Sequence, residues 1–561
     1  MVFVSTLFLR ADYFRLMIDS ISLTRLRLGI TINEVTVKPS SPKKRFDLSL
    51  VSHSKVFVRD ATGLTKNVSL FDAISINVTY MSVGAALSLV GYTMVALPTV
   101  AGVNLVYGSM IAALLAVPQM IVYTMMSRRI SRTGGDYVWL SRSLGGFLGS
   151  TITLMGVTLE TMPYLALIAL SVVFAIGSVG LSLGYSNMLG LALPGNIAGA
   201  NPLLQFILGS AMFIVLIVIN ILKPRLGFKL ISLYWIIGVI GVAVATITLL
   251  NAGTTGVENY INGLNIANTT YISIANSYSG STFDLNTTLL MMPFFALFTY
   301  PWFNAAPSVG SELKGKAPRW NVPLSLLFAF LVVTVPFATM YYVGGFAFTT
   351  AALANPTLVY DYSFNFFTLA MGVSSNFVQS FIIGLSWIVL TVAILAFGII
   401  TISRYMLAQS FDRFLPSKLA YVSPKYGSPV TAHLLDLVVT IGLIGLAAFL
   451  YGTLSSLYGA VMAAMIYFAF VGLAAVAYAL KNERGTSKAV LAIAGLLQTL
   501  VFIYLTSQFL AYPAIWGGNT LAYSYITATF ILGAVIYAIR KGTQGKDGIN
   551  IDLAFKEIPP E

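Results

Sequence analysis

The chain has 561 residues, of which 32 are Lys or Arg and 19 are Asp or Glu, so that only 9% are charged. An ordinary soluble domain carries roughly a quarter of charged residues. With 57% apolar residues and a mean hydropathy of +0.85, the chain has too little charge to cover the surface of a soluble globule. A soluble enzyme, a disordered chain and a nucleic-acid-binding protein are therefore excluded.

Residues that usually hold metals or disulfides are nearly absent. There is no Cys, and the two His are His53, in a polar N-terminal segment, and His433, beside a basic segment. We expect both His outside the membrane core. Without a thiolate or a His cluster, the sequence indicates no metal site, no disulfide and no cofactor.

Twelve apolar segments are long enough to cross a bilayer, which takes about 20 residues of α-helix. We predict helices at 71–98, 101–126, 145–177, 202–222, 228–251, 287–310, 321–345, 376–407, 430–451, 455–480, 488–511 and 520–540. The predicted fold class is an all-α integral membrane protein with 12 transmembrane helices.

The positive charges fall on one side of this predicted topology. All 32 Lys and Arg lie in the two tails or in every second loop. The net charge of +13 therefore reflects the orientation of the chain in the membrane. Cytoplasmic loops are the ones enriched in Lys and Arg. We therefore predict a multi-pass protein of the cell membrane with both termini cytoplasmic, and no polyanion-binding patch.

Three segments outside the predicted helices have distinct compositions. Residues 1–55 read as a poorly ordered cytoplasmic tail, or else as a regulatory or lipid-binding one, and 541–561 as a C-terminal cytoplasmic tail. The outer loop 252–286 is rich in Asn, Ser and Thr. It contains two possible glycosylation sites, Asn268 and Asn286.

Two predicted helices contain helix breakers near mid-span. The first carries Tyr80-Met81-Ser82-Val83-Gly84, and the sixth carries Phe298-Thr299-Tyr300-Pro301-Trp302. These helices are five apart and run in opposite directions, as expected for an inverted five-helix repeat with a ligand site where two discontinuous helices meet. A simple kink or a packing Gly remains the alternative. Free N–H groups at one half-helix end suit an anion and free carbonyls suit a cation, so an amino acid zwitterion fits such a site.

Three predicted cytoplasmic stretches follow helices 2, 6 and 8. They are Gly134-Gly135-Asp136-Tyr137, in which Asp136 could cap or pair near the next helix, Glu312 to Pro323, and Ser403 to Pro429. In this order they resemble the amino acid–polyamine–organocation superfamily, closest to its prokaryotic amino acid permeases. The resemblance runs from about Val56 to the twelfth helix.

The resemblance implies a leucine-transporter-type fold. Residues 56–480 would form the inverted-repeat core, with helices 1–5 at 71–251 and helices 6–10 at 287–480, and 488–540 would add two helices. The substrate carboxylate would bind the N–H groups of Ser82, Val83 and Gly84. The substrate amino group would bind backbone carbonyls, those of Tyr80 or Met81 and those of Phe298, Thr299 and Pro301. Phe298 would be the aromatic gate. Ser82 and Trp302 stand where the family often has Gly, and Trp302 would reshape the side-chain pocket.

Candidates for the coupling ion are few. Glu160 lies about 14 residues into the third helix, roughly 21 Å along it, and a carboxylate at that depth is by default a functional candidate. A structural, hydrogen-bonded acid is the equal alternative. In some proton-coupled members of the family such a Glu pairs with a Lys of helix 5, and that Lys is missing here around Trp235. Sodium would need oxygens such as those of Ser386 and Thr391. Asp72 and Asp436 are expected at the membrane interface.

These observations favour a secondary active transporter that moves amino acids by alternating access, with protons as the favoured coupling ion and sodium still open. An amino acid or amine exchanger or a polyamine transporter of the same superfamily is the alternative. A membrane sensor on the same fold is more remote. An intramembrane enzyme is not indicated, because Glu160 is the only carboxylate expected deep in a helix and both His are expected outside it.

Overall fold

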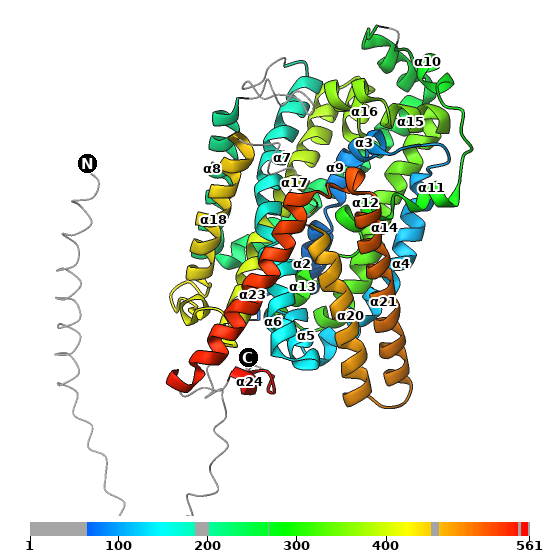
Figure 1. Cartoon of the computed structure of the whole chain (residues 1–561). Coiled ribbons are helices and arrows are strands. Elements are labelled where there is room, and N and C mark those ends of the chain that lie inside the picture. The colour runs from blue at the N-terminus through cyan, green and yellow to red at the C-terminus, as the bar shows by residue number, and fades with distance from the viewer. Residues whose placement is uncertain are drawn as a thin grey trace, which may run out of the picture. The chain divides into compact units, whose positions relative to one another are not determined.

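The structure is a computed structural model that describes residues 64, 66–185, 201–267, 269–449, 459, 461–547 and 551–558. The predicted tail 1–55, His53 and Asn268 lie outside these residues. In the described part, most residues are helical and β-structure is limited to two isolated bridges, Val68–Leu313 and Thr133–Val309. The predicted all-α class is confirmed (Figure 1).

Eleven helices in the described part are long and apolar enough to cross a membrane. They are α2 with α3 (Leu70–Ala96), α4 (Leu105–Arg129), α6 with η2 and α7 (Gly146–Ser182), α8 (Pro202–Leu222), α9 (Pro224–Gly263), α14 (Ala317–Gly344), α17 (Phe377–Phe411), α18 (Val430–Phe449), α20 (Met462–Asn482), α21 (Gly485–Ala511) and α23 (Thr520–Asp547, apolar as far as Thr543).

The predicted helix at 287–310 is divided into short pieces. It consists of α11 (Leu285–Leu289), α12 (Met292–Phe298), α13 (Ala305–Ser308) and the 3₁₀ turn η5 (Gly310–Glu312). Backbone between α12 and α13 is not helical: Thr299 has φ −145° and ψ −82°. One of the twelve predicted spans is therefore a broken segment rather than a continuous helix.

The predicted loop 252–286 is more helical than expected. Helix α9 continues through a kink at Gly253, which has φ +59°, and ends at Gly263, and α10 (Tyr271–Asn276) follows. Asn286 is exposed on α11. Short helices also join the long ones: α5 (Asp136–Leu144), α15 (Phe346–Leu353), η6 (Thr357–Asp361), α16 (Phe366–Gly372), η7 (Ser417–Ala420), α22 (Pro513–Trp516) and α24 (Ile551–Ala554).

The two broken helices run in opposite directions and lie side by side. The backbone N–H of Val68, just before α2, donates to the carbonyl of Glu312, just after α13, and Lys314 N–H donates back to Val68. Beyond this start-to-end contact, α2 packs on α13 and α3 packs on α12. This antiparallel arrangement is the one expected for corresponding helices of an inverted repeat.

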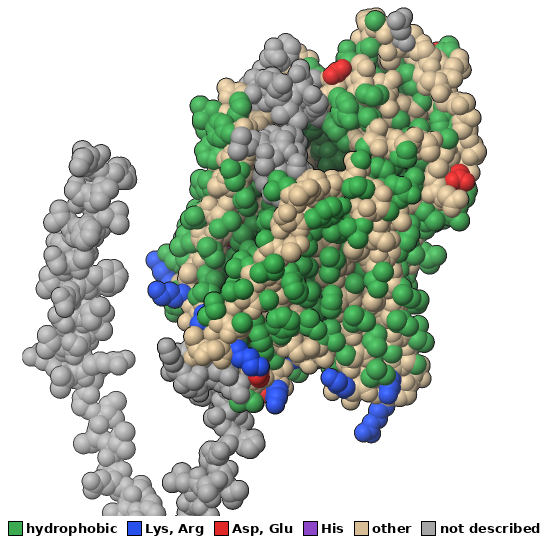
Figure 2. Space-filling model, viewed as in Figure 1, with side chains coloured by type: hydrophobic (Ala, Val, Ile, Leu, Met, Phe, Trp, Pro, Cys, Tyr) green, Lys and Arg blue, Asp and Glu red, His purple; other side chains and the backbone are tan. Residues whose placement is uncertain are grey.

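Positive side chains gather at one end of the bundle, called the basic end below (Figure 2). Helix α4 reaches it at Arg128 and Arg129, and α20 reaches it at Lys481. The flanks of the bundle are covered by apolar side chains, as expected for a surface that faces lipid.

Candidate functional site

The first broken helix changes direction at Ser82. This residue has φ +58°, in the left-handed region, and separates α2 (Leu70–Tyr80) from α3 (Val83–Ala96). Gly84 follows in the first turn of α3, where a Cβ would lie 2.8 Å from Cβ of Leu390 on α17. The break predicted at 82–84 is confirmed, and Gly84 is required by the close approach of two helices.

The second break lies between Thr299 and Asn304. Trp302 folds back so that its indole N–H donates to the carbonyls of Ala296, at 3.1 Å, and Leu297, at 2.9 Å, which satisfies carbonyls near the end of α12. Pro301 has no N–H to continue the helix. The residue that departs from the family's Gly thus stabilises the break as well as filling space beside it.

Aromatic rings fill the space between the two breaks. Tyr80 stands edge-on to Trp302 with ring centroids 5.3 Å apart, and also to Phe397 of α17 at 5.5 Å. Trp302 in turn contacts Phe468 of α20. Tyr80, Phe298 and Trp302 are each at most 5% exposed. The breaks are therefore closed off from solvent in this conformation.

Only some of the predicted ligand groups are available. Ser82 N–H donates to the carbonyl of Thr79, whereas Val83 and Gly84 N–H find no partner in the described part of the chain. The Pro301 carbonyl accepts from the Gln119 side chain at 2.8 Å and from Phe303 N–H. Pro301 is thus a poorer ligand than predicted.

The carbonyls of Thr299 and Tyr300 accept no hydrogen bond from any described residue. The hydroxyl of Thr299 is also buried without a partner there. Donors at the start of α3 and acceptors after α12 therefore remain at the two breaks, which is the pairing that a zwitterion requires.

Glu160 lies beside the first break. It follows the π-helical turn η2 (Leu154–Thr158) and is 2% exposed, with Oε1 unpartnered among the described residues and Oε2 3.4 Å from the Thr161 hydroxyl. Tyr164, one turn further on the same helix face, lies 3.2 Å from Ser82 between their hydroxyl oxygens. Glu160 is also within electrostatic range of Tyr80 and of Tyr525 on α23.

The hydroxyls of the two sodium candidates are already engaged. Ser386 donates to the carbonyl of Ile383 and Thr391 to that of Trp387, so both hydroxyls bond their own helix. Ser386 packs against Gly241 of α9. In α9, Trp235 occupies the region where the family's coupling Lys was expected. Its side chain is buried and packs on Phe328.

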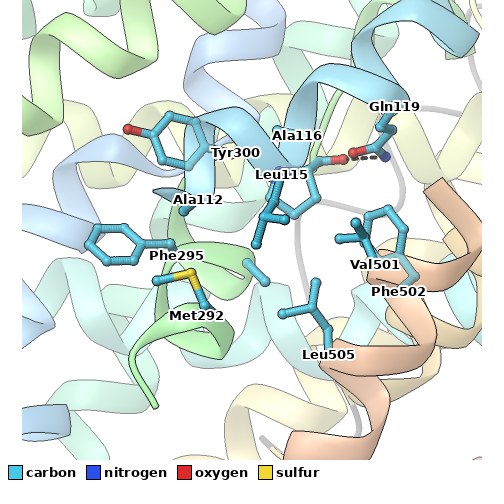
Figure 3. A pocket seen from close by; sticks show the side chains of 12 residues that line it. Ala112, Leu115, Ala116, Gln119, Met292, Phe295, Tyr300, Val501, Phe502 and Leu505 are labelled. Atoms are coloured by element: carbon cyan, nitrogen blue, oxygen red, sulfur yellow. Dashed lines mark hydrogen bonds between the residues drawn. The ribbon is translucent and has the colours of Figure 1, made fainter. Parts of the chain in front are cut away.

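A small cavity of about 30 Å³ lies beside the second break (Figure 3). Its lining comes from α4, from α12 and the break, and from α21, and includes Phe295, Tyr300 and Phe502. Of the polar groups shown in it, the Gln119 amide N–H donates to the Pro301 carbonyl and Tyr300 bonds Ser109 at 2.5 Å, while Gln119 Oε1 has no partner among the described residues. No charged side chain lines this cavity, so it does not suit a zwitterion.

The basic end is closed by buried polar contacts between helices. Glu312, after α13, forms a two-armed ion pair with Arg404 of α17, with Nε–Oε1 2.9 Å and Nη2–Oε2 3.2 Å. The side chains are 5% and 1% exposed. A second buried pair joins Arg142 of α5 to Asp412, which also accepts a 2.7 Å hydrogen bond from Tyr137.

The segment before α5 packs tightly against the end of α13. Gly134 and Gly135 have φ +84° and +43°, as the predicted tight turn requires, and a Cβ on Gly135 would lie 2.6 Å from the Pro307 backbone. Gly134 N–H donates to the Ser308 carbonyl at 2.8 Å. The predicted motif is therefore a contact surface for the second broken helix.

Two ionisable groups in the first half of α18 are buried within the protein. His433 and Asp436, expected outside the core and at the interface, are both 0% exposed on α18. They lie on the face of α18 that packs against neighbouring helices, which a position near a helix end does not reveal. Asp72, in contrast, is partly exposed in the cap of α2, where it pairs with Ser69 and Ser232.

Several residues that contact the breaks were not predicted from the sequence. Asn77 donates to Asn321 and accepts from the Ala306 N–H, which ties α2 to α13 and α14. Gln119 and Tyr164 were missed as well. For Tyr164 a signal existed, because it is four residues after Glu160 and shares its helix face.

In the part of the chain that the structure describes, eleven helices long enough to span a membrane and two facing helix breaks indicate an all-α membrane transporter. The comparison with protein families agrees, because the family described as amino acid permease matches residues 70–535. The chain belongs to this amino acid permease family. It is also 20% identical over 492 residues to "Uncharacterized protein 399" of Sulfolobus islandicus rod-shaped virus 1, covering 86% of this chain and 97% of that protein.

Proposed function

We propose that the protein carries an amino acid across the cell membrane by alternating access, with the basic end and both termini in the cytoplasm. The substrate carboxylate binds the N–H groups of Val83 and Gly84, and the amino group binds the carbonyls of Thr299 and Tyr300. The observation that supports this most is the juxtaposition of unpartnered donors and acceptors at two antiparallel breaks. In the described conformation the breaks are enclosed and the basic end is closed.

The side-chain pocket favours small substrates. The Tyr80 ring lies at the breaks, with its centroid 5.3 Å from that of Trp302 and 5.5 Å from that of Phe397. A large substrate side chain would have to displace the Trp302 indole from the carbonyls that it binds. Small neutral amino acids are therefore the proposed substrates.

Protons are the proposed coupling ion, and Glu160 is the proposed carrier. Its carboxyl is buried with one unpartnered oxygen, and Tyr164 links its helix face to Ser82 at the substrate site. Exchange of amino acids or amines is the second candidate. The observation in its favour is that α9 places the buried Trp235 where a coupling Lys would lie.

The test is uptake into proteoliposomes driven by an imposed pH gradient. Glu160→Gln should abolish proton-driven accumulation while leaving exchange of substrate at equal concentrations intact. Asp436→Asn is the matched control, since Asp436 is an equally buried acid on α18. Unchanged accumulation in Glu160→Gln would remove this residue as the proton carrier and leave exchange as the better description.

A further inference from the structure

One buried carboxylate at the basic end has no part in the substrate or proton sites proposed above. Asp136, the first residue of α5, is 0% exposed. Tyr123 of α4 donates to its Oδ2 at 2.6 Å, and Tyr405 of α17 donates to its Oδ1. Tyr467 of α20 also lies close to the carboxylate, without a hydrogen bond of normal geometry.

These contacts connect α4 and the second broken helix to α5 and α17, and they break if the two sides move apart when the basic end opens. Asn304, at the start of α13, donates to the Tyr405 hydroxyl at 3.1 Å, and Tyr405 donates to Asp136. Tyr123 reaches the same carboxylate from α4. The carboxyl therefore joins α4 to α17, and Tyr405 extends the connection to Asn304 of the second broken helix.

The charge state of this carboxyl matters because the groups that act on it in the described part of the chain include no cation. Its neighbours are hydroxyls, and the two arginines nearby are already paired, Arg142 with Asp412 and Arg404 with Glu312. Helix α6 contributes no ionisable side chain, and α20 contributes Tyr467. Lys481, at the end of α20, bonds the Ser143 carbonyl at the opposite end of α5 from Asp136. An ionised carboxylate without a cation is costly to bury, whereas water reaches it once the end opens.

We propose that Asp136 is a proton-binding site that holds the basic end closed when the compartment on that side is acidified. The inference rests on the alternating-access part of the proposed function. Protonation removes the cost of burying the charge in the closed conformation and leaves the carboxyl able to bond the tyrosines. Deprotonation restores that cost and favours the open, hydrated conformation.

The direction follows from the difference in proton affinity between the two conformations. Burial raises the pKa of Asp136 from 3.8 to about 6, against the tyrosine hydroxyls that lower it. A hydrated carboxyl in the open conformation has a pKa near 3.9. The closed conformation therefore binds the proton more tightly, and the ratio of open to closed molecules falls about tenfold from pH 7.5 to pH 5.

The chain contains no Cys, so a single introduced thiol reports opening without background. Ser308→Cys places the thiol at a residue that is buried in the closed basic end. Thr486→Cys, exposed at the same end, corrects for the pH dependence of the thiol reagent. Both are made in the full-length chain in proteoliposomes, and labelling rates are compared from pH 5 to pH 8.

We expect the corrected labelling rate of Ser308→Cys to fall about tenfold between pH 7.5 and pH 5. Asp136→Asn should make the profile flat, and Tyr123→Phe, which removes a donor to the ionised form, should move the midpoint to higher pH. The proposal is overturned if the parent protein gives a flat profile, if Asp136→Asn leaves the profile unchanged, or if Tyr123→Phe does not move the midpoint. None of these results would contradict the proposed transport function. No labelling at any pH would contradict alternating access itself.

Discussion

The buried ion pair between Glu312 and Arg404 should control how often the basic end opens. In Glu312→Gln the Arg404 guanidinium, whose side chain is 1% exposed, loses both carboxylate contacts. Removing one partner of a buried pair costs about 3–5 kcal/mol, because the remaining charge is uncompensated. Since an open basic end hydrates the guanidinium, this cost falls on the closed conformation.

A cost of about 3 kcal/mol corresponds to a shift of roughly 100-fold in the ratio of open to closed molecules, at 1.4 kcal/mol for each factor of ten. The assay is the labelling rate of Ser308→Cys in proteoliposomes, corrected with Thr486→Cys. The double variant Glu312→Gln with Arg404→Met should recover much of the closed population, because it leaves no unpaired charge.

The matched control is the ion pair of Arg129 with Glu483 at the same end, whose side chains are 23% and 14% exposed. A pair with this access to solvent contributes about 0–1 kcal/mol, so Glu483→Gln should change labelling by less than about fivefold. If Glu312→Gln labels no faster than Glu483→Gln, the buried pair does not hold the basic end closed and the reasoning is refuted.

Three further variants test other contacts. Gly84→Ala should lower transport strongly, because its Cβ would lie 2.8 Å from Leu390, and adding Leu390→Ala should restore part of it; no rescue would contradict the contact. Trp302→Ala should admit larger substrates in competition assays but lower thermal stability, since the Ala296 and Leu297 carbonyls lose their donor; an unchanged substrate range would refute the pocket assignment. Phe555→Ala should cost about 3 kcal/mol of stability, measured by thermal unfolding, because the ring packs on Gly146; an unchanged unfolding temperature would contradict this packing.

The class of fold could be predicted from local properties of the sequence. Length and hydropathy of each segment decide whether it can span a membrane, and both are properties of consecutive residues. The helix breakers at Gly84 and Pro301 were also visible. The exact turning point at Ser82 was less so, because a non-glycine residue at φ +58° is held there by its surroundings rather than by its own preference.

The closure of the basic end could not be predicted, because it depends on residues far apart in the chain. Asp136 meets Tyr123, which is 13 residues away, and Tyr405, which is 269 residues away. Glu312 and Arg404 were each visible as charges in a loop or at a helix end, but their pairing depends on how α13 and α17 pack. The burial of His433 and Asp436 against neighbouring helices could not be predicted for the same reason.

Substrate counterflow tests the central claim most directly. Proteoliposomes are loaded with an unlabelled amino acid or amine, one compound at a time, and the transient entry of the same labelled compound is measured without any ion gradient. The account predicts counterflow of small neutral amino acids that is lost in Gly84→Ala. No counterflow of any amino acid or amine by the full-length protein would contradict the assignment of the two breaks as a transport site.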